Sequence, residues 1–337
     1  MRESENAAAS WCPTEASSPF RRPRPEDLLT GAEVFGRHNV TWPGVTSAMS
    51  SRQYRCEADF ESMLALLSET YGIVRGPVCC TSSELEWWRF QESDPDAEIA
   101  SAWLWEMPGG KLIAYAWPGG DEVDVAVHPH HERVRSDVMA WSETWRRDRA
   151  QGSTEPAVLR TSVVTTDAGA MSGLRERGYE PTESRRQWRL RPLDAEVPIT
   201  LPSPGYVIDE LRGPRELQAR EDLAQHPFRT HLTRAGTYRP DLNLVARSAG
   251  GSLTAFCTAW LDEPNRLGVI EPLECLAEHR RRGLARAMMS EALARLRSLG
   301  ATAAIITNNA TNDPAAALYS SLGFERKGEI VRWERAL

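Results

Sequence analysis

The chain has 337 residues, enough for about two domains of ~150 residues each. Its composition, 41% hydrophobic and 26% charged, is that of a globular protein able to bury sizeable cores. Acidic residues outnumber basic ones by 47 to 40, for a net charge of −7, which argues against a nucleic-acid partner and a polybasic membrane anchor. No apolar run approaches the ~20 residues of a membrane span, so no membrane partner is expected.

Residues 1–50 are rich in Ser, Pro, Arg and Glu and show little periodicity, which predicts a largely disordered extension. They contain no apolar signal-peptide segment, and Met49 is a second candidate start residue. The six cysteines form no C-x-x-C pair and no disulfide-like spacing. We therefore expect reduced thiols and a cytoplasmic location.

A first globular unit is predicted over residues 51–195. Apolar residues recur at helical spacing between Phe60 and Leu67, and residues 99–105 and 112–117 have the pattern of strands. The proline-rich stretch 192–204 reads as a linker.

A second unit, residues 196–337, repeats features of the first in the same order. The sequence GGKLIAY at 109–115 matches GGSLTAF at 250–256, and LRERGY at 174–179 matches YSSLGF at 319–324. Trp188 matches Trp333 at a similar offset of about 145 residues. The repeat predicts two copies of one α/β fold.

The stretch from 267 to 300 carries the clearest chemical pattern. An apolar strand-like segment at 267–276 leads into the basic loop Arg280-Arg281-Arg282-Gly283, and an amphipathic helix follows over 284–299. A basic loop at a helix N-terminus presents free N–H groups beside the positive end of the helix dipole. Gly283 lets a ligand approach the backbone closely, so this loop is a candidate phosphate cradle.

A second strand at 301–307 is followed by a turn and a short helix over 312–324. The motif Arg280-x-x-Gly283-x-Ala285, followed by Asn312-x-x-Ala315-x-x-Leu318-Tyr319-x-x-x-Gly323-Phe324, resembles the acetyl-CoA-binding core of the GNAT acyltransferase superfamily. The resemblance covers about residues 244–333. It implies an α/β fold of two tandem GNAT-like domains, each a central twisted mixed sheet flanked by helices, a layout similar to that of the mycothiol synthases.

The resemblance also implies roles for individual residues. The backbone of Leu273, Glu274 and Cys275 would pair with the pantetheine arm of acetyl-CoA, Asn312 would bond that arm, and Tyr319 would protonate the departing thiolate as general acid. The pyrophosphate would be held by the loop and the helix start, namely Arg280, Arg281, Arg282, Gly283, Leu284, Ala285 and Arg286.

Two carboxylates, Glu271 and Glu274, are candidates for the general base, and Glu271 is slightly preferred. Because they are three residues apart on a strand, at most one is expected to face the cleft, unless Pro272 marks a bulge. Some relatives place the base at the end of the next strand, where Thr307 cannot serve. A purely structural role for both carboxylates is the alternative.

The first copy lacks these groups and is predicted to be degenerate. Leu174 stands opposite Tyr319, and Asp167 opposite Asn312. The positions opposite Arg280, Gly283 and Ala285 hold Glu132, Arg135 and Asp137. Acidic groups repel a pyrophosphate, so this copy should not bind CoA in the usual way and would instead shape the acceptor pocket or stabilise the pair.

Two other patterns in the sequence suggest chemistry. The run His128-Pro129-His130-His131 lacks a partner cluster at metal-ligand spacing, so we expect a solvent loop and no metal. Cys275 near His279 suggests a thiol nucleophile, but a small residue at a strand end is the simpler interpretation.

The predicted function is transfer of acetyl from acetyl-CoA to a primary amine of a small molecule in a ternary complex, by a monomer or homodimer. An amine of thiol or sugar metabolism and an antibiotic are both open as acceptors. A protein amine is the alternative acceptor, and a non-catalytic acyl-CoA sensor or scaffold is the alternative from another class.

Overall fold

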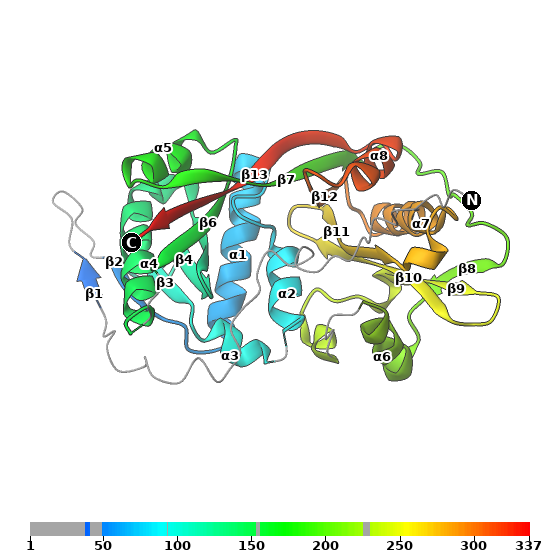
Figure 1. Cartoon of the computed structure of the whole chain (residues 1–337), viewed down its shortest axis with the longest axis horizontal. Coiled ribbons are helices and arrows are strands. Elements are labelled where there is room, and N and C mark those ends of the chain that lie inside the picture. The colour runs from blue at the N-terminus through cyan, green and yellow to red at the C-terminus, as the bar shows by residue number, and fades with distance from the viewer. Residues whose placement is uncertain (1–37, 41–48, 93, 153–155, 225–229) are drawn as a thin grey trace, which may run out of the picture.

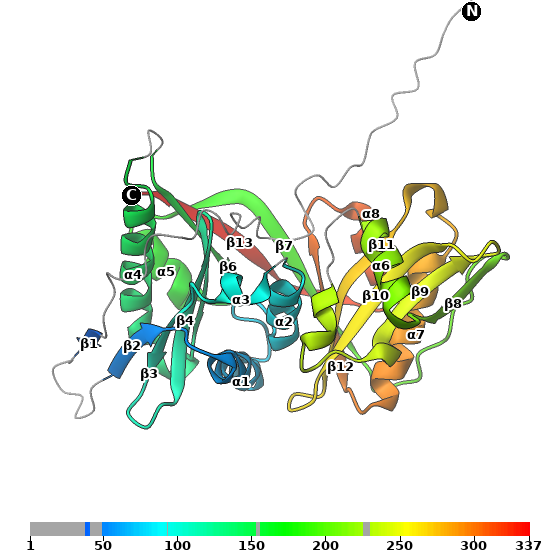
Figure 2. The same ribbon diagram turned by 90° about the horizontal axis from the view of Figure 1, so that it is seen from below.

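The computed structural model describes residues 38–40, 49–92, 94–152, 156–224 and 230–337. Their strands form one 13-stranded sheet in the order β1-β2-β3-β4-β5-β6-β13-β7-β12-β11-β10-β9-β8. Helices cover both faces of this sheet (Figures 1 and 2). The prediction of an α/β fold with mixed sheets flanked by helices is confirmed.

The first half of the chain supplies seven strands and six helical segments to the described structure. The strands are β1 (His38–Val40), β2 (Met49–Gln53), β3 (Trp103–Glu106), β4 (Leu112–Gly119), β5 (Glu122–Val127), β6 (Val158–Val164) and β7 (Glu180–Pro192). The helices are α1 (Glu57–Val74), α2 (Ser82–Phe90), α3 (Pro95–Ile99), the 3₁₀ segment η2 (Pro129–Val134), α4 (Arg135–Arg149) and α5 (Ala168–Glu176).

The second half repeats this order of elements. Its strands are β8 (Tyr206–Glu210), β9 (Asn243–Ser248), β10 (Leu253–Asp262), β11 (Leu267–Cys275), β12 (Ala303–Asn309) and β13 (Glu325–Ala336). Its helices are α6 (Gly213–Ala224), α7 (Leu284–Ser298) and α8 (Asp313–Ser321), with the 3₁₀ segments η3 (Thr230–Arg234), η4 (Pro240–Leu242) and η5 (Ala277–His279).

The two halves exchange their last strands. β7 ends the first half of the chain but pairs with β12 of the second, while β13 returns to pair with β6 of the first. β7 and β13 also pair with each other at the centre of the sheet. Figure 1 shows the consequence, because the C-terminus lies beside α4 of the first half and far from α8. The predicted boundary at 195/196 thus divides the sequence in two. In space, the last strand of each half completes the sheet of the other half.

Outward from this central pair, the order of the described strands is symmetric apart from β1, which has no counterpart at the other edge. β13 is followed by β6, β5, β4, β3 and β2, and β7 by β12, β11, β10, β9 and β8. In each half one pair is parallel, β5 with β6 and β11 with β12. The predicted internal repeat is therefore present as a pseudo-twofold arrangement within one chain.

One hydrophobic core is shared by the two halves. Phe60 of α1 and Trp87 of α2 belong to the same buried cluster as Phe256 and Trp260 of β10. Two further clusters lie on the opposite face, one under α4 and α5 and the other under α7 and α8. Burial of apolar surface is the main driving force of folding, so the shared cluster couples the halves energetically.

Several local predictions need correction. Residues 38–40 and 49–50 of the predicted disordered extension are in paired strands, and the other residues of that extension lie outside the described ranges. Residue Ile99 ends helix α3, so the strand predicted from 99 begins only at Trp103. His128 is buried rather than in a solvent loop; its Nδ1 accepts a hydrogen bond from His130 N–H, and its Nε2 lies 3.3 Å from a carboxylate oxygen of Glu69.

The match between Trp188 and Trp333 is one residue out of register. Trp188 pairs with Thr307 on β12, whereas Trp333 pairs with Thr161 on β6, the counterpart of Ile306. The two indoles consequently pack on different faces of the sheet. A shift of one residue moves a strand side chain to the other face.

Candidate active site

The sheet opens between β11 and β12. The two strands are paired only from Leu267 to Val269, opposite Ala303 to Ile305. Beyond this point β11 continues to Cys275 and stays paired with β10 alone on its other side. The free edge of β11 includes the predicted residues Leu273, Glu274 and Cys275. Unpaired strand backbone of this kind can pair with an extended amide-bearing ligand.

A β-bulge in β11 lies beside this opening. Cys257 pairs with Leu273 and Ala259 with Ile270, so Glu271 and Pro272 together lie opposite one residue of β10. The extra residue changes the alternation of side chains along the strand. The bulge that Pro272 suggested is therefore present, and it interrupts the regular alternation that would turn Glu271 and Glu274 to opposite faces.

The carboxyl groups of Glu271 and Glu274 are both poised to exchange protons near neutral pH. Burial raises the pKa of Glu271 to about 8, assisted by the negative charges of Glu84 and Glu274 and opposed by Arg186. Burial raises the pKa of Glu274 to about 7, opposed by Arg220 and Arg280. Pairs of groups with pKa values near 7 are typical of acid–base chemistry.

The basic loop forms the start of α7, as the sequence predicts. Arg281 and Gly283 adopt left-handed backbone conformations, with φ of 61° and 73°. Gly283 is the N-cap and provides no side-chain hydrogen bond, so the first N–H groups of α7 lack a side-chain cap. A Cβ placed on Gly283 would meet no atom within 4 Å.

The side chains of this loop are arranged around that open space. Arg280, Arg281 and Arg282 are exposed, whereas Leu284 is buried in the core and contributes only its backbone. Ala285 and Arg286 are partly buried, and the Arg286 guanidinium donates to Ser321 Oγ of α8. Open backbone N–H groups flanked by guanidinium groups fit a pyrophosphate.

Helix α8 carries two of the predicted residues, one as its N-cap and one in its last turn. Asn312 is its N-cap, and its side-chain oxygen accepts a hydrogen bond from Ala315 N–H at 3.1 Å. Tyr319 is 7% exposed and packs edge-on against Phe324. Burial raises the pKa of Tyr319, and the negative charge of Glu271 adds to this effect. The phenol is thus protonated at neutral pH, as a general acid must be.

Helix α2 of the first half packs against this part of the second half. The carboxylate of Glu86 accepts hydrogen bonds from the backbone of Gly236 and Thr237, and Trp87 packs against Trp260. Glu84, fixed by a capping box with Thr81, acts electrostatically on Glu271. The first copy therefore forms one wall near the candidate base.

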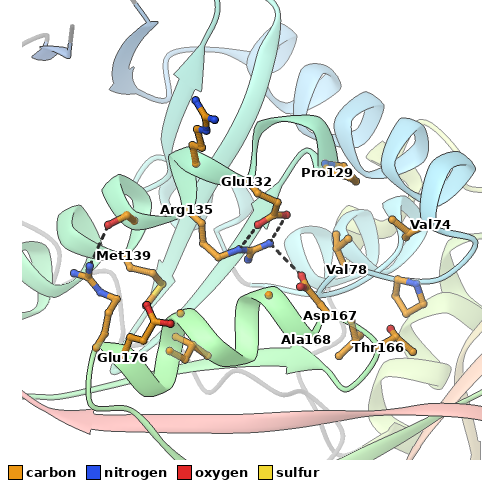
Figure 3. A pocket seen from close by; sticks show the side chains of 18 residues that line it. Val74, Val78, Pro129, Glu132, Arg135, Met139, Thr166, Asp167, Ala168 and Glu176 are labelled. Carbon is orange, nitrogen blue, oxygen red and sulfur yellow. Dashed lines mark hydrogen bonds and ion pairs between the residues drawn. The ribbon is translucent and has the colours of Figure 1, made fainter. Parts of the chain in front are cut away.

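The corresponding site in the first copy is built differently. Strands β5 and β6 also diverge, after Val123 and Thr161. A cavity of about 790 Å³ lies between α4, α5 and the end of β6. Arg135, at the start of α4, lies between Glu132 and Asp167 and donates to both carboxylates at 2.8–3.2 Å (Figure 3).

The structure defines which residues of the two copies are equivalent. Asp167 caps α5 through Ala170 N–H just as Asn312 caps α8. Leu174 occupies the position of Tyr319, as expected. Counted from the helix starts, Val134 rather than Arg135 corresponds to Gly283. The first copy has Val134 where the second has the open glycine turn, and the ion pairs of Arg135 lie next to this position.

The alternative of a thiol nucleophile finds no support in the geometry. The His279 ring bonds to the hydroxyl of Tyr206 at 2.8 Å, while burial raises the pKa of the Cys275 thiol, so the two do not form a nucleophile–base pair. Within the described ranges no group of three or more His, Cys, Asp or Glu side chains is arranged to hold a metal ion. No helix among those residues has the length and apolar character of a membrane span.

Comparison with models of protein families gives a match in the second half of the chain. Residues 208–324 match the model of the acetyltransferase (GNAT) family. These residues form a GNAT domain. They include the opening between β11 and β12, the basic loop and α8. No curated protein matches the sequence significantly.

Solved GNAT structures share the fold of nearly the whole chain. A GCN5-related N-acetyltransferase from Sphaerobacter thermophilus is 18% identical with a TM-score of 0.59, over 86% of this chain and 95% of that one. A tandem GNAT protein from the clavulanic acid biosynthesis pathway is 17% identical with a TM-score of 0.61, over 86% and 98%. An acetyltransferase of the GNAT family from Colwellia psychrerythraea is 12% identical with a TM-score of 0.53, over 84% and 98%. The tandem GNAT fold predicted from the sequence is thus confirmed.

A polar residue that the sequence did not indicate packs against the GNAT domain from outside residues 208–324. The exchanged strand β7 brings Arg189 beneath α8, where its guanidinium donates to Asn308 Oδ1 at 3.2 Å and Ser320 Oγ at 3.1 Å. Nothing in the local sequence marks this residue, because it precedes the linker and belongs to the half with the degenerate motif. Only the strand exchange places it in the second half.

Proposed function

We propose that the protein transfers an acetyl group from acetyl-CoA to a primary amine of a small molecule, within a ternary complex. Acyl transfer is the general activity of the GNAT family to which the matched domain belongs. The observation that carries the proposal is the divergence of β11 from β12, directly in front of an uncapped helix start with an open glycine.

Acetyl-CoA would be bound by backbone and charge. The free edge of β11 at Leu273–Cys275 pairs with the amide groups of the pantetheine arm, and Asn312 adds a side-chain contact. The N–H groups after Gly283 and the exposed guanidinium groups of the loop bind the pyrophosphate. The thioester then lies between β11 and α8.

Two groups of this site would move protons. Glu271, or Glu274 in its place, accepts the proton that the amine must lose before its nitrogen attacks the thioester carbonyl. Tyr319 gives its proton to the sulfur of CoA as the carbon–sulfur bond breaks. Direct attack needs no covalent enzyme intermediate, in agreement with the raised pKa of Cys275.

A small acceptor is favoured by the position of α2. This helix is fixed to the second half by Glu86 and Trp87 and brings Glu84 near Glu271. A site with a wall provided by a second domain suits a small molecule better than a protein chain. Carboxylates around it favour a cationic amine.

The test is calorimetric titration of acetyl-CoA into the full chain. One site per chain is expected, abolished by Gly283→Glu because a carboxylate then faces the pyrophosphate. The Arg135→Met variant is the matched control in the first copy and should bind normally. Normal binding by Gly283→Glu would contradict the position of the cradle, and a second site would show that the first copy is not degenerate.

A further inference from the structure

Arg189 is a buried cation with neutral partners. Its side chain is 7% exposed, and it donates hydrogen bonds to the amide oxygens of Gln187 and Asn308 and to the hydroxyl of Ser320. Within the described ranges it forms no ion pair, and the positive charge of Arg326 lies close enough to lower its pKa further, after burial itself. A buried charge without a counter-ion destabilises a fold.

The first copy shows that the fold does not need an arginine at this position. Arg189 pairs with Ile306 on β12, and in the first copy Trp333 pairs with Thr161, the counterpart of Ile306. Trp333 is buried and lies under Arg175, the counterpart of Ser320 on α5. An aromatic side chain thus fills the equivalent space where no tyrosine is present on the helix.

The copy that has Tyr319 also has the polar partner of Arg189, and the copy without the tyrosine has neither. Asn308, which accepts from Arg189, is replaced by Val163 in the first copy, and Tyr319 itself by Leu174. Of the charges that act on Tyr319, Glu271 opposes loss of its proton and Arg189 favours it. The guanidinium group is therefore present in the copy that has a phenol to influence.

We propose that Arg189 is a positioning residue for acyl transfer: it fixes α8 through Ser320 and supplies the positive charge that stabilises the phenolate of Tyr319. The inference rests on the proposed role of Tyr319 as general acid. It assigns a function in the GNAT domain to a residue contributed by the first half of the chain.

The proton balance of the reaction shows why a positive charge is needed near Tyr319. The amine nitrogen forms a bond to the carbonyl carbon, and its proton passes to Glu271. The carbon–sulfur bond breaks, its electron pair goes to sulfur, and the sulfur takes the proton of Tyr319. The phenolate persists until it recovers the proton through solvent, and throughout that interval a buried cation lowers its energy.

The experiment measures release of CoA from acetyl-CoA with hydroxylamine as the nucleophile. Hydroxylamine is largely unprotonated at neutral pH, so the rate reports on the leaving-group side of the reaction. Arg189→Gln keeps a hydrogen-bond donor and loses the charge, whereas Arg189→Lys keeps the charge. We expect kcat to fall ~10- to 100-fold in Arg189→Gln, part of the ~10²–10⁴-fold contribution of a general acid, and to be largely retained in Arg189→Lys.

A more acidic phenol separates the electrostatic role from a structural one. Incorporation of 3-fluorotyrosine at position 319 should restore kcat in Arg189→Gln, because an intrinsically acidic phenol needs less help from a cation. Arg191→Gln is the matched control, since Arg191 also lies on β7 and donates to a carbonyl at the end of α8, and it should leave kcat unchanged.

The outcomes are distinct. Full activity of Arg189→Gln, or a loss that fluorotyrosine does not restore, overturns the inference about Arg189. An unchanged kcat in Tyr319→Phe removes the general acid and contradicts the proposed mechanism instead. A wild-type chain that binds no acetyl-CoA in the calorimetric titration contradicts the proposed function as a whole.

Discussion

The two copies of the fold place the same elements around two different sites. In the second copy the loop before α7 is an open glycine turn with exposed arginines, and α8 presents a buried tyrosine. In the first copy Arg135 is bound between two carboxylates, and a leucine stands in place of the tyrosine. A shared backbone therefore provides the position of the site, while a few side chains decide what the site can do.

The first copy also contributes directly to the second. It contributes β7 to the sheet of the GNAT domain and α2 to the wall near Glu271. One hydrophobic cluster extends through both halves. A copy that has neither the open glycine turn nor the tyrosine can thus still have a structural role in the site of the other copy.

The largest expected effect is that of separating the halves. A chain of residues 196–337 lacks β7 and α2, which leaves an edge of β12 and part of the shared core exposed to water. We expect this fragment to be insoluble or to unfold without cooperativity in thermal circular dichroism.

A longer fragment provides the matched control for that experiment. A chain of residues 178–337 restores β7 next to β12 and should be measurably more soluble. A cooperative transition in the 196–337 fragment like that of the full chain would show that the exchange is unimportant for stability.

Removal of the phenol hydroxyl should affect catalysis and spare binding. Tyr319→Phe is expected to lower kcat by ~10²–10⁴-fold, because the thiolate then departs without a proton. The affinity for acetyl-CoA measured by calorimetry should stay nearly the same. Leu174→Met at the equivalent position of the first copy conserves volume and should change neither quantity.

The pH profile should reveal which carboxylate is the base. A base must be unprotonated to act, so kcat should rise with pH and level off above the pKa of the group. The inflection is expected near pH 8 for Glu271 and near pH 7 for Glu274. Glu271→Gln and Glu274→Gln are the paired variants, and the one that loses ~10²-fold or more in kcat identifies the base.

The smallest expected effect is in the first copy. Arg135→Met removes the ion pairs with Glu132 and Asp167, which are partly exposed and contribute about 1 kcal/mol or less to stability. Denaturant unfolding should show this small loss while kcat stays unchanged. A large fall in kcat would mean that the first copy takes part in the reaction.

Local patterns determined much of what the sequence predicted correctly. The amphipathic period placed α7, the asparagine and glycine signals bounded α8, and the repeat indicated two copies. These features depend on residues that are near one another in the chain. The positions of the predicted site residues on β11, the loop and α8 follow from the same local signals.

Tertiary structure decided what depends on pairing between distant segments. The bulge at Glu271 is defined by its register with β10, and the Trp188–Trp333 match failed because a one-residue shift in strand pairing reverses the face. The exchange of β7 and β13, which brings Arg189 beneath α8, leaves no mark in composition or period. Strand partners are chosen by burial across the whole sheet, and a sequence pattern records only which face of a strand is apolar.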